Sequence, residues 1–358
     1  MATDVSHNAD QVGDPGTTEN YMYTDDNQTN DTMVAGHAHG VWMIVFENVQ
    51  LVLSIVGYIA NKMTFITLVR NGHMFSPAIR LLLKHQALAD SWICAMGTIV
   101  LLQPPMWTTG NEYFDVAVCH LWHSQAPFWG AILLSVWTLA AIAIERYMAV
   151  CHPFKNAQIQ GSLAVYSLVA MYIANVIVIV PSYGQVRFEN GVCLSEYVIP
   201  GPLGEQLYLA YCVVWFFAVY LIPVTAYVYL YGSVVLTLYR RSTSSACSSK
   251  AIDSAQTTIT KTAITLTGIF LFAIGYDAWA YLLGYTGVTE YEFGSTKQKV
   301  GVFFSVFNSV INPFVYLALM PSFRGSLRKT FLCCVEENDK INSSAERSDT
   351  SKGELSKI

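Results

Sequence analysis

Seven apolar runs, each long enough to cross a lipid bilayer, dominate the chain. A transmembrane helix needs about 20 mainly apolar residues, and the charged residues of this chain cluster between the runs. Only 13% of the 358 residues are charged, about half the share found in soluble domains. We therefore expect an all-α membrane protein, a bundle of seven transmembrane helices. The predicted spans are residues 42–69, 78–103, 119–151, 162–184, 206–239, 257–285 and 298–320.

The distribution of charge predicts how the chain crosses the membrane. Residues 1–40 contain seven acidic residues and no Lys or Arg. Basic residues follow the odd-numbered spans, as Arg70, Lys155, Arg240 and Arg324 illustrate. Because short loops rich in Lys and Arg stay in the cytoplasm, we expect a multi-pass protein of the plasma membrane, with an extracellular N-terminus and a cytoplasmic C-terminus.

The first forty residues predict a disordered extracellular arm. Residues 1–40 are acidic and poor in apolar side chains, a composition that does not support a packed core. Asn27 and Asn30 each begin an Asn-x-Thr sequon, so both are expected glycosylation sites. The folded bundle is expected to cover residues 41–320.

The segment after the last span predicts a short helix on the inner membrane surface. Within residues 321–334, large apolar side chains recur at helical spacing among basic ones, the pattern of an amphipathic surface helix. Cys333 and Cys334 at its end are placed for palmitoylation. Residues 335–358 are polar and predict a disordered cytoplasmic tail.

Two motifs lie at the ends of predicted spans. Glu145, Arg146 and Tyr147 end the third apolar run, and charge there must sit at an interface or face protein because it is costly in lipid. Asn312, Pro313 and Tyr316 stand near the end of the seventh run. These motifs resemble the acidic-Arg-Tyr and Asn-Pro-x-x-Tyr signatures of rhodopsin-like (class A) G-protein-coupled receptors. The resemblance covers about residues 41–334 and assigns no subfamily.

The resemblance implies a receptor that carries a signal from an extracellular ligand to a heterotrimeric G protein, with arrestin and receptor kinases as further partners. Glu145 would hold Arg146 at rest, and outward movement of span six would release it. Thr258 stands where many members carry an acid, so a second clasp on Arg146 is not expected and basal activity would be raised. The implied switch residues are Glu145, Arg146, Tyr147, Tyr231, Asn312, Pro313 and Tyr316.

An acidic residue in span two predicts a polar pocket within the membrane. Asp90 lies inside the apolar run, and an ionisable residue there requires partners. The resemblance supplies oxygen-bearing partners and implies a sodium site that favours the inactive state; no other cofactor is expected. A hydrated structural network without sodium is the alternative. The pocket residues are Asn61, Asp90, Ser135, Asn308, Ser309 and Asn312.

Two cysteines outside the membrane are the expected disulfide. Cys119 and Cys193 match the family's bridge between span three and the second outer loop. Cys119 precedes Arg146 by two residues more than is usual in the family, so we expect an irregular start to span three.

Span six departs most from the family. Aligned on Phe272, Gly275 and Tyr276 stand at the Cys and Trp of the Cys-Trp-x-Pro motif, and Ala278 replaces the Pro. Tyr276 would act as the bulky rotamer switch, and Gly268 and Gly275 are the expected weak points. The implied transmission core is Val136, Pro223, Phe272 and Tyr276.

The outer ends of the spans predict an aromatic ligand pocket for a peptide or a small aromatic or lipid-like molecule. Phe128 stands where amine receptors carry an Asp, which argues against an amine bound in that way. Val306 stands where opsins carry the retinal Lys, which disfavours a covalent photoreceptor. Asp277 would contact ligand, a neighbouring span or the headgroups. The expected pocket residues are Gln125, Phe128, Trp129, Ile132, Trp215, Phe216, Tyr276, Trp279 and Phe303.

Other function classes fit less well. A transporter would show an internal repeat, and the sequence has none that we detect. An enzyme would need a nucleophile–base pair or a metal-spacing set, and the eight His residues form none beyond the pairs His37/His39 and His120/His123. A light-driven pump would need a Lys in mid-span seven. The main alternative is a receptor-like protein that binds ligand or forms heteromers without signalling, because span six is altered.

Overall fold

The computed structural model describes residues 26–101, 108–194, 198–199, 201–243, 250–291 and 294–331. Six helical segments of this part are long and apolar enough to cross a membrane. The remaining span, the second in chain order, is α2, which is more polar than the others because it carries Arg80, Lys84 and Asp90. The seven-helix bundle predicted from the sequence is confirmed. Its elements are α1 (Asp26–Asn71), η1 (Gly72–Met74), α2 (Pro77–Leu101), α3 (Glu112–Val118), η2 (Cys119–His123), α4 (Ala126–Cys151), α5 (Pro153–Ile179), η3 (Val180–Gln185), β1 (Arg187–Glu189), β2 (Val192–Leu194), α6 (Pro202–Phe216), η4 (Phe217–Leu221), α7 (Ile222–Thr243), α8 (Lys250–Tyr285), α9 (Thr296–Leu319) and α10 (Pro321–Phe331).

Helix α1 begins earlier than the sequence predicts. We expected residues 1–40 to be unstructured, but the helix starts at Asp26. Adding residues to an existing helix is far easier than starting one, so the membrane span extends into the polar segment before it. Met1–Phe46 forms one compact unit and Glu47–Ile358 another; the bundle below is the second unit.

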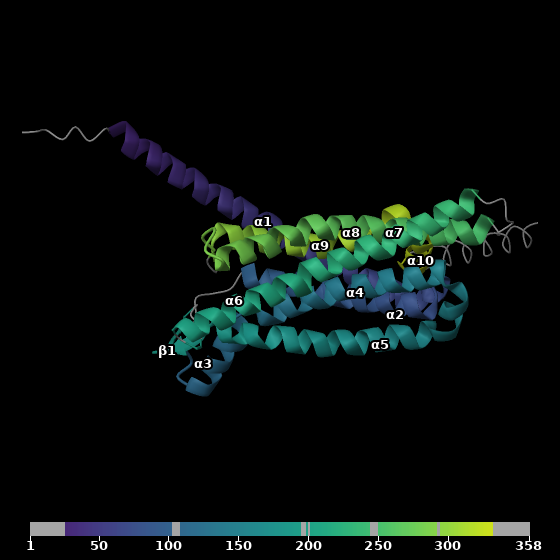
Figure 1. Ribbon diagram of the computed structural model, residues 1–358. Coiled ribbons are helices and arrows are strands. Elements are labelled where there is room, and N and C mark those ends of the chain that lie inside the picture. The colour runs from purple at the N-terminus through teal and green to yellow at the C-terminus, as the bar shows by residue number, and fades with distance from the viewer. Residues whose placement is uncertain are drawn as a thin grey trace, which may run out of the picture. The chain divides into compact units, whose positions relative to one another are not determined.

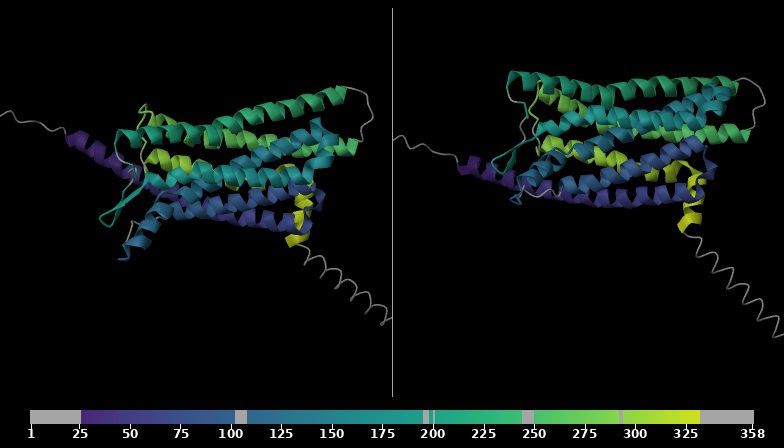
Figure 2. Two further views of the ribbon diagram at one scale, coloured as in Figure 1. Left: turned by 60° about the horizontal axis from the view of Figure 1, so that its bottom comes forward. Right: turned by 90° about the horizontal axis from the view of Figure 1, so that it is seen from below.

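Helix α4 is the centre of the bundle. It packs against α2, α5, α7 and α8, and 72% of its most apolar stretch is buried, against 17% for α5. The helices run side by side, with η2 and the β1–β2 hairpin at one end and α10 across the other (Figures 1 and 2). We refer to these as the disulfide end and the Arg146 end.

Two short π-helical segments interrupt the spans. Segment η2 precedes α4, and Gln125, between them, adopts a left-handed conformation with φ of 57°. Segment η4 lies directly before Pro223 of α7. A π turn holds an extra residue and frequently marks a functional position. Segment η2 lies at the start of span three, where the sequence predicts an irregularity.

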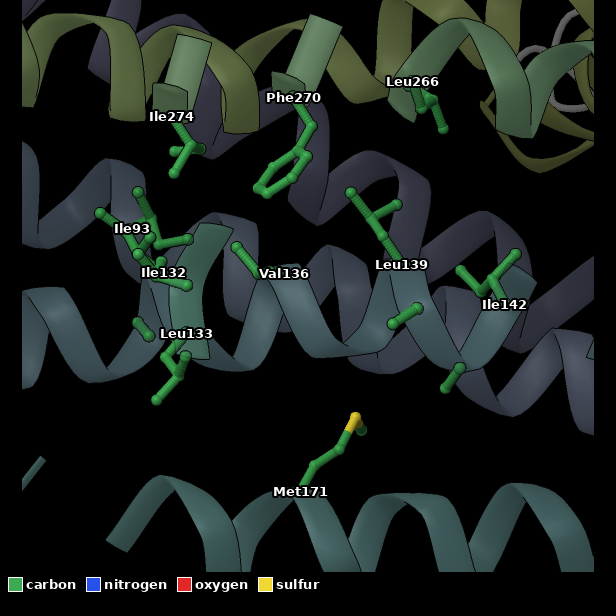
Figure 3. Close-up of a cluster of buried hydrophobic side chains, with 14 of the residues drawn as sticks. Ile93, Ile132, Leu133, Val136, Leu139, Ile142, Met171, Leu266, Phe270 and Ile274 are labelled. Atoms are coloured by element: carbon green, nitrogen blue, oxygen red, sulfur yellow. The ribbon is translucent and has the colours of Figure 1, made fainter. Parts of the chain in front are cut away.

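The middle of the bundle corrects the expected register of α8. Phe270 is fully buried and Ile274 nearly so, and both point toward Val136 and Ile132 of α4 (Figure 3). Phe272 is 74% exposed. The placement of Phe272 in the core was therefore wrong, because residues two positions apart on a helix face directions about 200° apart.

Moving the alignment by two residues reassigns the rest of α8. Ile274 then stands at the Trp position of the family motif, and Tyr276, which is 39% exposed, stands at the Pro position. Tyr276 was therefore wrongly placed as the rotamer switch. The position expected to hold an acid moves from Thr258 to Gln256, so the chain lacks a carboxylate there in either register.

Candidate functional site

A buried ion pair lies at the Arg146 end of α4. The Arg146 Nε donates a hydrogen bond to Glu145 Oε2 at 2.6 Å, and a second guanidinium nitrogen contacts the same oxygen. Both side chains are at most 3% exposed. Ser76, just before α2, donates to the other Glu145 oxygen at 3.3 Å. The arginine is therefore held by its neighbour in sequence.

Two tyrosines from other helices lie near this pair. Tyr231 of α7 interacts electrostatically with Arg146, and Tyr316 of α9 with Tyr231. Both rings are buried, and the Tyr316 hydroxyl has no hydrogen-bond partner among the described residues. Tyr147 instead lies toward the surface, where its hydroxyl is 3.2 Å from His152 Nε2. Arg146, Tyr231 and Tyr316 thus lie near one another inside the bundle, whereas Tyr147 lies toward the surface.

The polar pocket gathers around Asp90. Ser135 of α4 donates to Asp90 Oδ1 at 2.9 Å, and Asn312 of α9 donates to Oδ2 at 2.6 Å. Asn61 of α1 bonds instead to the backbone carbonyl of Ser309. Asn308 is buried, and its Oδ1 has no partner within the described part of the chain. Three helices are thus joined through one carboxylate.

Gln86 is a member of the polar pocket that the sequence analysis did not predict. Its Nε2 lies 3.1 and 3.0 Å from the two Asp90 oxygens and 2.5 Å from Ser135 Oγ. An ion bound to Asp90 and Ser135 would have to occupy this place. The residues therefore do not fit a sodium ion in this arrangement, because an amide donor already satisfies the carboxylate. The i,i+4 spacing of Gln86 and Asp90 was the available signal.

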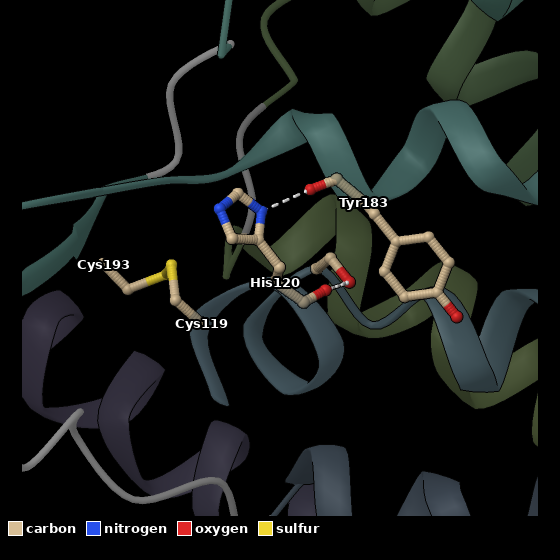
Figure 4. Close-up of a disulfide and its surroundings, with 5 residues drawn as sticks. Cys119, His120, Tyr183 and Cys193 are labelled. Atoms are coloured by element: carbon tan, nitrogen blue, oxygen red, sulfur yellow. Dashed lines mark hydrogen bonds between the residues drawn. A yellow bond between two sulfur atoms is a disulfide. The ribbon is translucent and has the colours of Figure 1, made fainter. Parts of the chain in front are cut away.

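The disulfide end is built on the bridge between Cys119 and Cys193. Their Cα atoms are 5.5 Å apart, and the bond ties η2 to strand β2 (Figure 4). Strand β1 pairs with β2 in antiparallel register through a turn at Asn190 and Gly191, both with positive φ. His120 Nδ1 lies 2.8 Å from the carbonyl oxygen of Tyr183, which fixes η2 against η3 (Figure 4). The hairpin is thereby fastened over the bundle.

A small cavity lies in this half of the bundle. Its volume is about 20 Å³, and side chains of η3, α4, α6, α8 and the loop after α8 surround it. Five of the lining residues are aromatic and one is acidic. The lining residues are Trp129, Ser182, Gln185, Tyr211, Trp215, Asp277, Tyr281 and Tyr291.

Most of the expected ligand-pocket residues lie elsewhere. Trp129 and Trp215 line the cavity, whereas Phe128, Ile132 and Phe216 are buried by packing and Phe303 is half-buried next to Phe304. Gln125 accepts a hydrogen bond from Gln298 at 3.3 Å.

Two residues of α8 that were expected in the ligand pocket do not line this cavity, so their placement was wrong. Tyr276 packs against Phe304 of α9, and Trp279 is 47% exposed beside Phe216. Asp277 and Tyr281 face the cavity instead. They are four residues apart and so share one helix face, a signal that the sequence offered. Tyr211 and Trp215 have the same spacing.

Some predicted sites lie outside the description. Cys333 and Cys334 fall beyond residue 331, as does the tail, and nothing is described of the side chains of Asn27 and Asn30. The short helix before them is present: α10 buries Phe323 and carries Arg328 and Lys329 in its last turn.

Comparison with known proteins agrees with this architecture. A rhodopsin of Galeus melastomus is 25% identical over 329 residues, 88% of this chain and 90% of its own. A blue-sensitive opsin of Conger conger is 25% identical over 292 residues, 78% of this chain and 79% of its own. A rhodopsin of Gallus gallus is 23% identical over 315 residues, 86% of each chain. The profile of the family described as 7 transmembrane receptor (rhodopsin family) matches residues 60–316, and the chain belongs to that family of membrane receptors.

Proposed function

We propose that this chain is a receptor of the plasma membrane that converts binding of an extracellular ligand into activation of a heterotrimeric G protein. The observation that carries the proposal is the buried pair of Glu145 and Arg146 at one end of the bundle. Removing two charges from water costs free energy that their mutual attraction often does not repay, so a buried ion pair is a poor device for stability alone. The buried pair is explained if it is a contact of the resting state that breaks on activation.

The proposed mechanism is a two-state exchange of partners. In the resting state Arg146 is bound to Glu145. When α8 moves outward, Arg146 turns toward Tyr231 and Tyr316, whose hydroxyls lie on the neighbouring helices α7 and α9. The space opened beside α4 admits a segment of the G protein. A ligand drives this exchange only by as much as it binds the active state better than the resting state.

Ligand-independent signalling tests the proposal without knowledge of the ligand. The full chain and an Arg146→Ala variant are expressed at matched surface levels, with reporters for each class of G protein. We expect a basal signal in one class that the variant loses. Arg70→Ala, which removes an exposed arginine at the end of α1, is the control and should signal normally. Equal signals from all three chains would refute coupling through Arg146.

A silent intact chain would favour the alternative, a receptor-like protein that binds ligand or forms heteromers without signalling. Its physical basis is α8, which has no proline where the family has one. Co-purification of the chain with a second receptor, together with silence in every reporter, would establish this alternative.

Photoreception is the second candidate because the similar proteins are rhodopsins and opsins. A covalent retinal needs a lysine amine within the bundle, and Val306 offers none. The lysines of α9 lie at its first turn, where Lys297 bonds to the Glu290 carbonyl and Lys299 to Glu47. Purified chain incubated with retinal should therefore gain no protein-bound visible absorbance that survives mild acid denaturation. A stable visible band would establish photoreception instead.

The proposed orientation places the sequons outside and the tail inside. A glycosidase should lower the apparent mass of the chain but leave an Asn27→Gln, Asn30→Gln double variant unchanged. Fatty-acid labelling should be lost in a Cys333→Ser, Cys334→Ser variant. Arrestin and receptor kinases are the proposed partners of the tail after activation.

A further inference from the structure

Asp277 of α8 is a buried carboxylate that the receptor mechanism does not use. Its side chain is 4% exposed, and no hydrogen-bond donor reaches its Oδ1 within the described part of the chain. It lies against the backbone of Gly301 on α9, where a Cβ atom would collide with the carboxylate. A carboxylate in this position is normally paired or bound to a ligand.

The basic side chains described at the disulfide end are engaged elsewhere. Arg187 is 2.7 Å from Glu189, and Lys299 is 2.7 Å from Glu47. Lys297 donates to the carbonyl oxygen of Glu290 at 2.8 Å. Within the described part of the chain, none of the ion pairs of Lys or Arg at this end involves Asp277.

Five aromatic rings line the cavity that Asp277 also lines. Trp129 and Tyr211 each pack against Trp215, with ring centroids 6.2 and 6.4 Å apart. Tyr281 and Tyr291, which line the same cavity, are 5.6 Å apart in an edge arrangement. The face of an aromatic ring attracts cations, most strongly when both are removed from water. A carboxylate among such rings has the chemistry of a cation-binding cage.

The size and the polar rim restrict which cation fits. A cavity of about 20 Å³ admits one group about the size of a water molecule, since such a group needs roughly 10–15 Å³. A primary ammonium has this size and three donors, whereas a quaternary ammonium is larger and has none. Gln185 donates to the Tyr281 hydroxyl at 2.6 Å, and both polar side chains line the cavity.

We propose that the ligand of this receptor carries a primary ammonium group that binds Asp277 within the cage of Trp129, Tyr211, Trp215, Tyr281 and Tyr291. The inference rests on the proposed function only in taking the chain to have an extracellular ligand. The amine is held from α8 rather than from α4, where Phe128 stands. A small amine and the amino group of a peptide share this chemistry.

The test measures binding to the purified full-length chain by thermal unfolding. The probe is n-propylammonium chloride, with sodium chloride at equal ionic strength as reference, and 1-propanol and tetramethylammonium chloride as comparisons. We expect the unfolding midpoint to rise saturably with n-propylammonium, to rise less with tetramethylammonium, and not to rise with 1-propanol. This order needs no variant and therefore does not depend on a variant's folding.

The Asp277→Asn variant should weaken the apparent affinity for n-propylammonium by at least about tenfold, because a charged hydrogen-bond partner is lost. Glu112→Gln, which removes an exposed acid at the same end, should bind normally. A midpoint unaffected by n-propylammonium, or raised equally in the Asp277→Asn variant, would overturn the proposal. Because this readout needs no G protein, its failure is distinct from loss of the basal signal in the Arg146→Ala test.

If n-propylammonium binds, competition experiments then distinguish a small-amine ligand from a peptide ligand. Small aromatic amines and short peptides with free or acetylated N-termini are each added with n-propylammonium. Displacement by the free peptides but not by the acetylated ones identifies a peptide amine, whereas displacement only by the small amines identifies a small-molecule ligand. If neither class displaces the probe, the cage does not bind the receptor's ligand and the assignment is wrong.

Discussion

The Gln86 amide donates to the buried carboxylate of Asp90, the group for which the sequence predicted a bound cation. Its Nε2 lies within hydrogen-bond distance of both Asp90 carboxylate oxygens and of the Ser135 hydroxyl. A neutral donor of this kind partly offsets the cost of burying the carboxylate. Gln86 thus joins α2 to α4.

Replacing this residue should create a response to sodium. In wild type, unfolding midpoints in sodium chloride and in N-methylglucamine chloride should agree. In Gln86→Leu, Asp90 loses its amide donor, so sodium should bind the native state and stabilise it. A rise of roughly 2–4 °C is the shift that about 1 kcal/mol produces. The rise should vanish in Gln86→Leu, Asp90→Asn. If sodium raises the unfolding midpoint of wild type as much as that of Gln86→Leu, Gln86 does not take the place of a sodium ion beside Asp90.

Two phenylalanines of α8 separate the observed register from the one the sequence suggested. Phe270 is fully buried against Tyr227, with ring centroids 5.6 Å apart, whereas Phe272 is 74% exposed. Phe270→Ala should therefore lower the free energy of unfolding by roughly 3–5 kcal/mol, and Phe272→Ala by less than about 1 kcal/mol. Thermal unfolding of the two purified variants measures the difference. The opposite order would restore the register based on Phe272.

The sequence could not decide between these phenylalanines. Both stand in an apolar run, and every side of a membrane helix is apolar whether it faces lipid or protein. The family's Trp and Pro are both missing from their usual positions in α8, so the sequence fits the family pattern equally well in either of two registers that differ by two residues. By contrast, Arg146, Asp90 and Pro313 are unusual in a membrane span, and the sequence placed each of them on the correct helix.

At the scale of elements, η2 shows how an irregular turn accommodates an insertion. Cys119 precedes Arg146 by two residues more than the family usually has, which would rotate it by about 200° on a regular helix. The π turn of η2 and the left-handed Gln125 take up the excess. The disulfide with Cys193 is therefore retained. The sequence predicted the bridge and an irregular start but not the kind of irregularity.

We predict that α8, which has no proline, bends at Gly268 rather than at Gly275, where Tyr220 packs against the glycine. Nothing lies within 4 Å of the Cβ that an alanine would add at Gly268. Gly268→Ala should raise stability by up to about 1 kcal/mol, because alanine favours helix over glycine, and should lower the basal signal by stiffening α8. Unfolding midpoints and G-protein reporters measure the two effects.

Gly232 of α7 provides the matched control for this element. It is equally open to an added Cβ but lies on a helix that is not expected to swing. Gly232→Ala should therefore raise stability without lowering the signal. If both variants reduce the signal alike, stiffening of α8 is not what limits activation.

At the scale of the molecule, the two ends are linked through one bundle with a polar centre. The aromatic cage lies between α4, α6 and α8, and the pair of Glu145 and Arg146 lies at the other end of α4. Between them, Asp90 ties α2, α4 and α9 together. A ligand that moves α8 relative to α4 changes the contacts of both ends at once, which is the physical content of coupling.

The strength of this coupling can be set from the Arg146 end. With Phe270 in the core, Gln256 is the position of α8 where many family members carry an acid that restrains the arginine. Gln256→Glu should add an ion pair in the resting state alone and lower the basal signal. A coupling free energy of about 1–3 kcal/mol corresponds to a reduction of roughly 5–150-fold. Reporters in cells with matched surface levels measure it, and Thr258→Glu, the position that the Phe272 register indicates, is the control. A stronger effect at Thr258 would show that α8 is in the other register. No effect at either position would mean that contact with α8 does not hold Arg146 at rest.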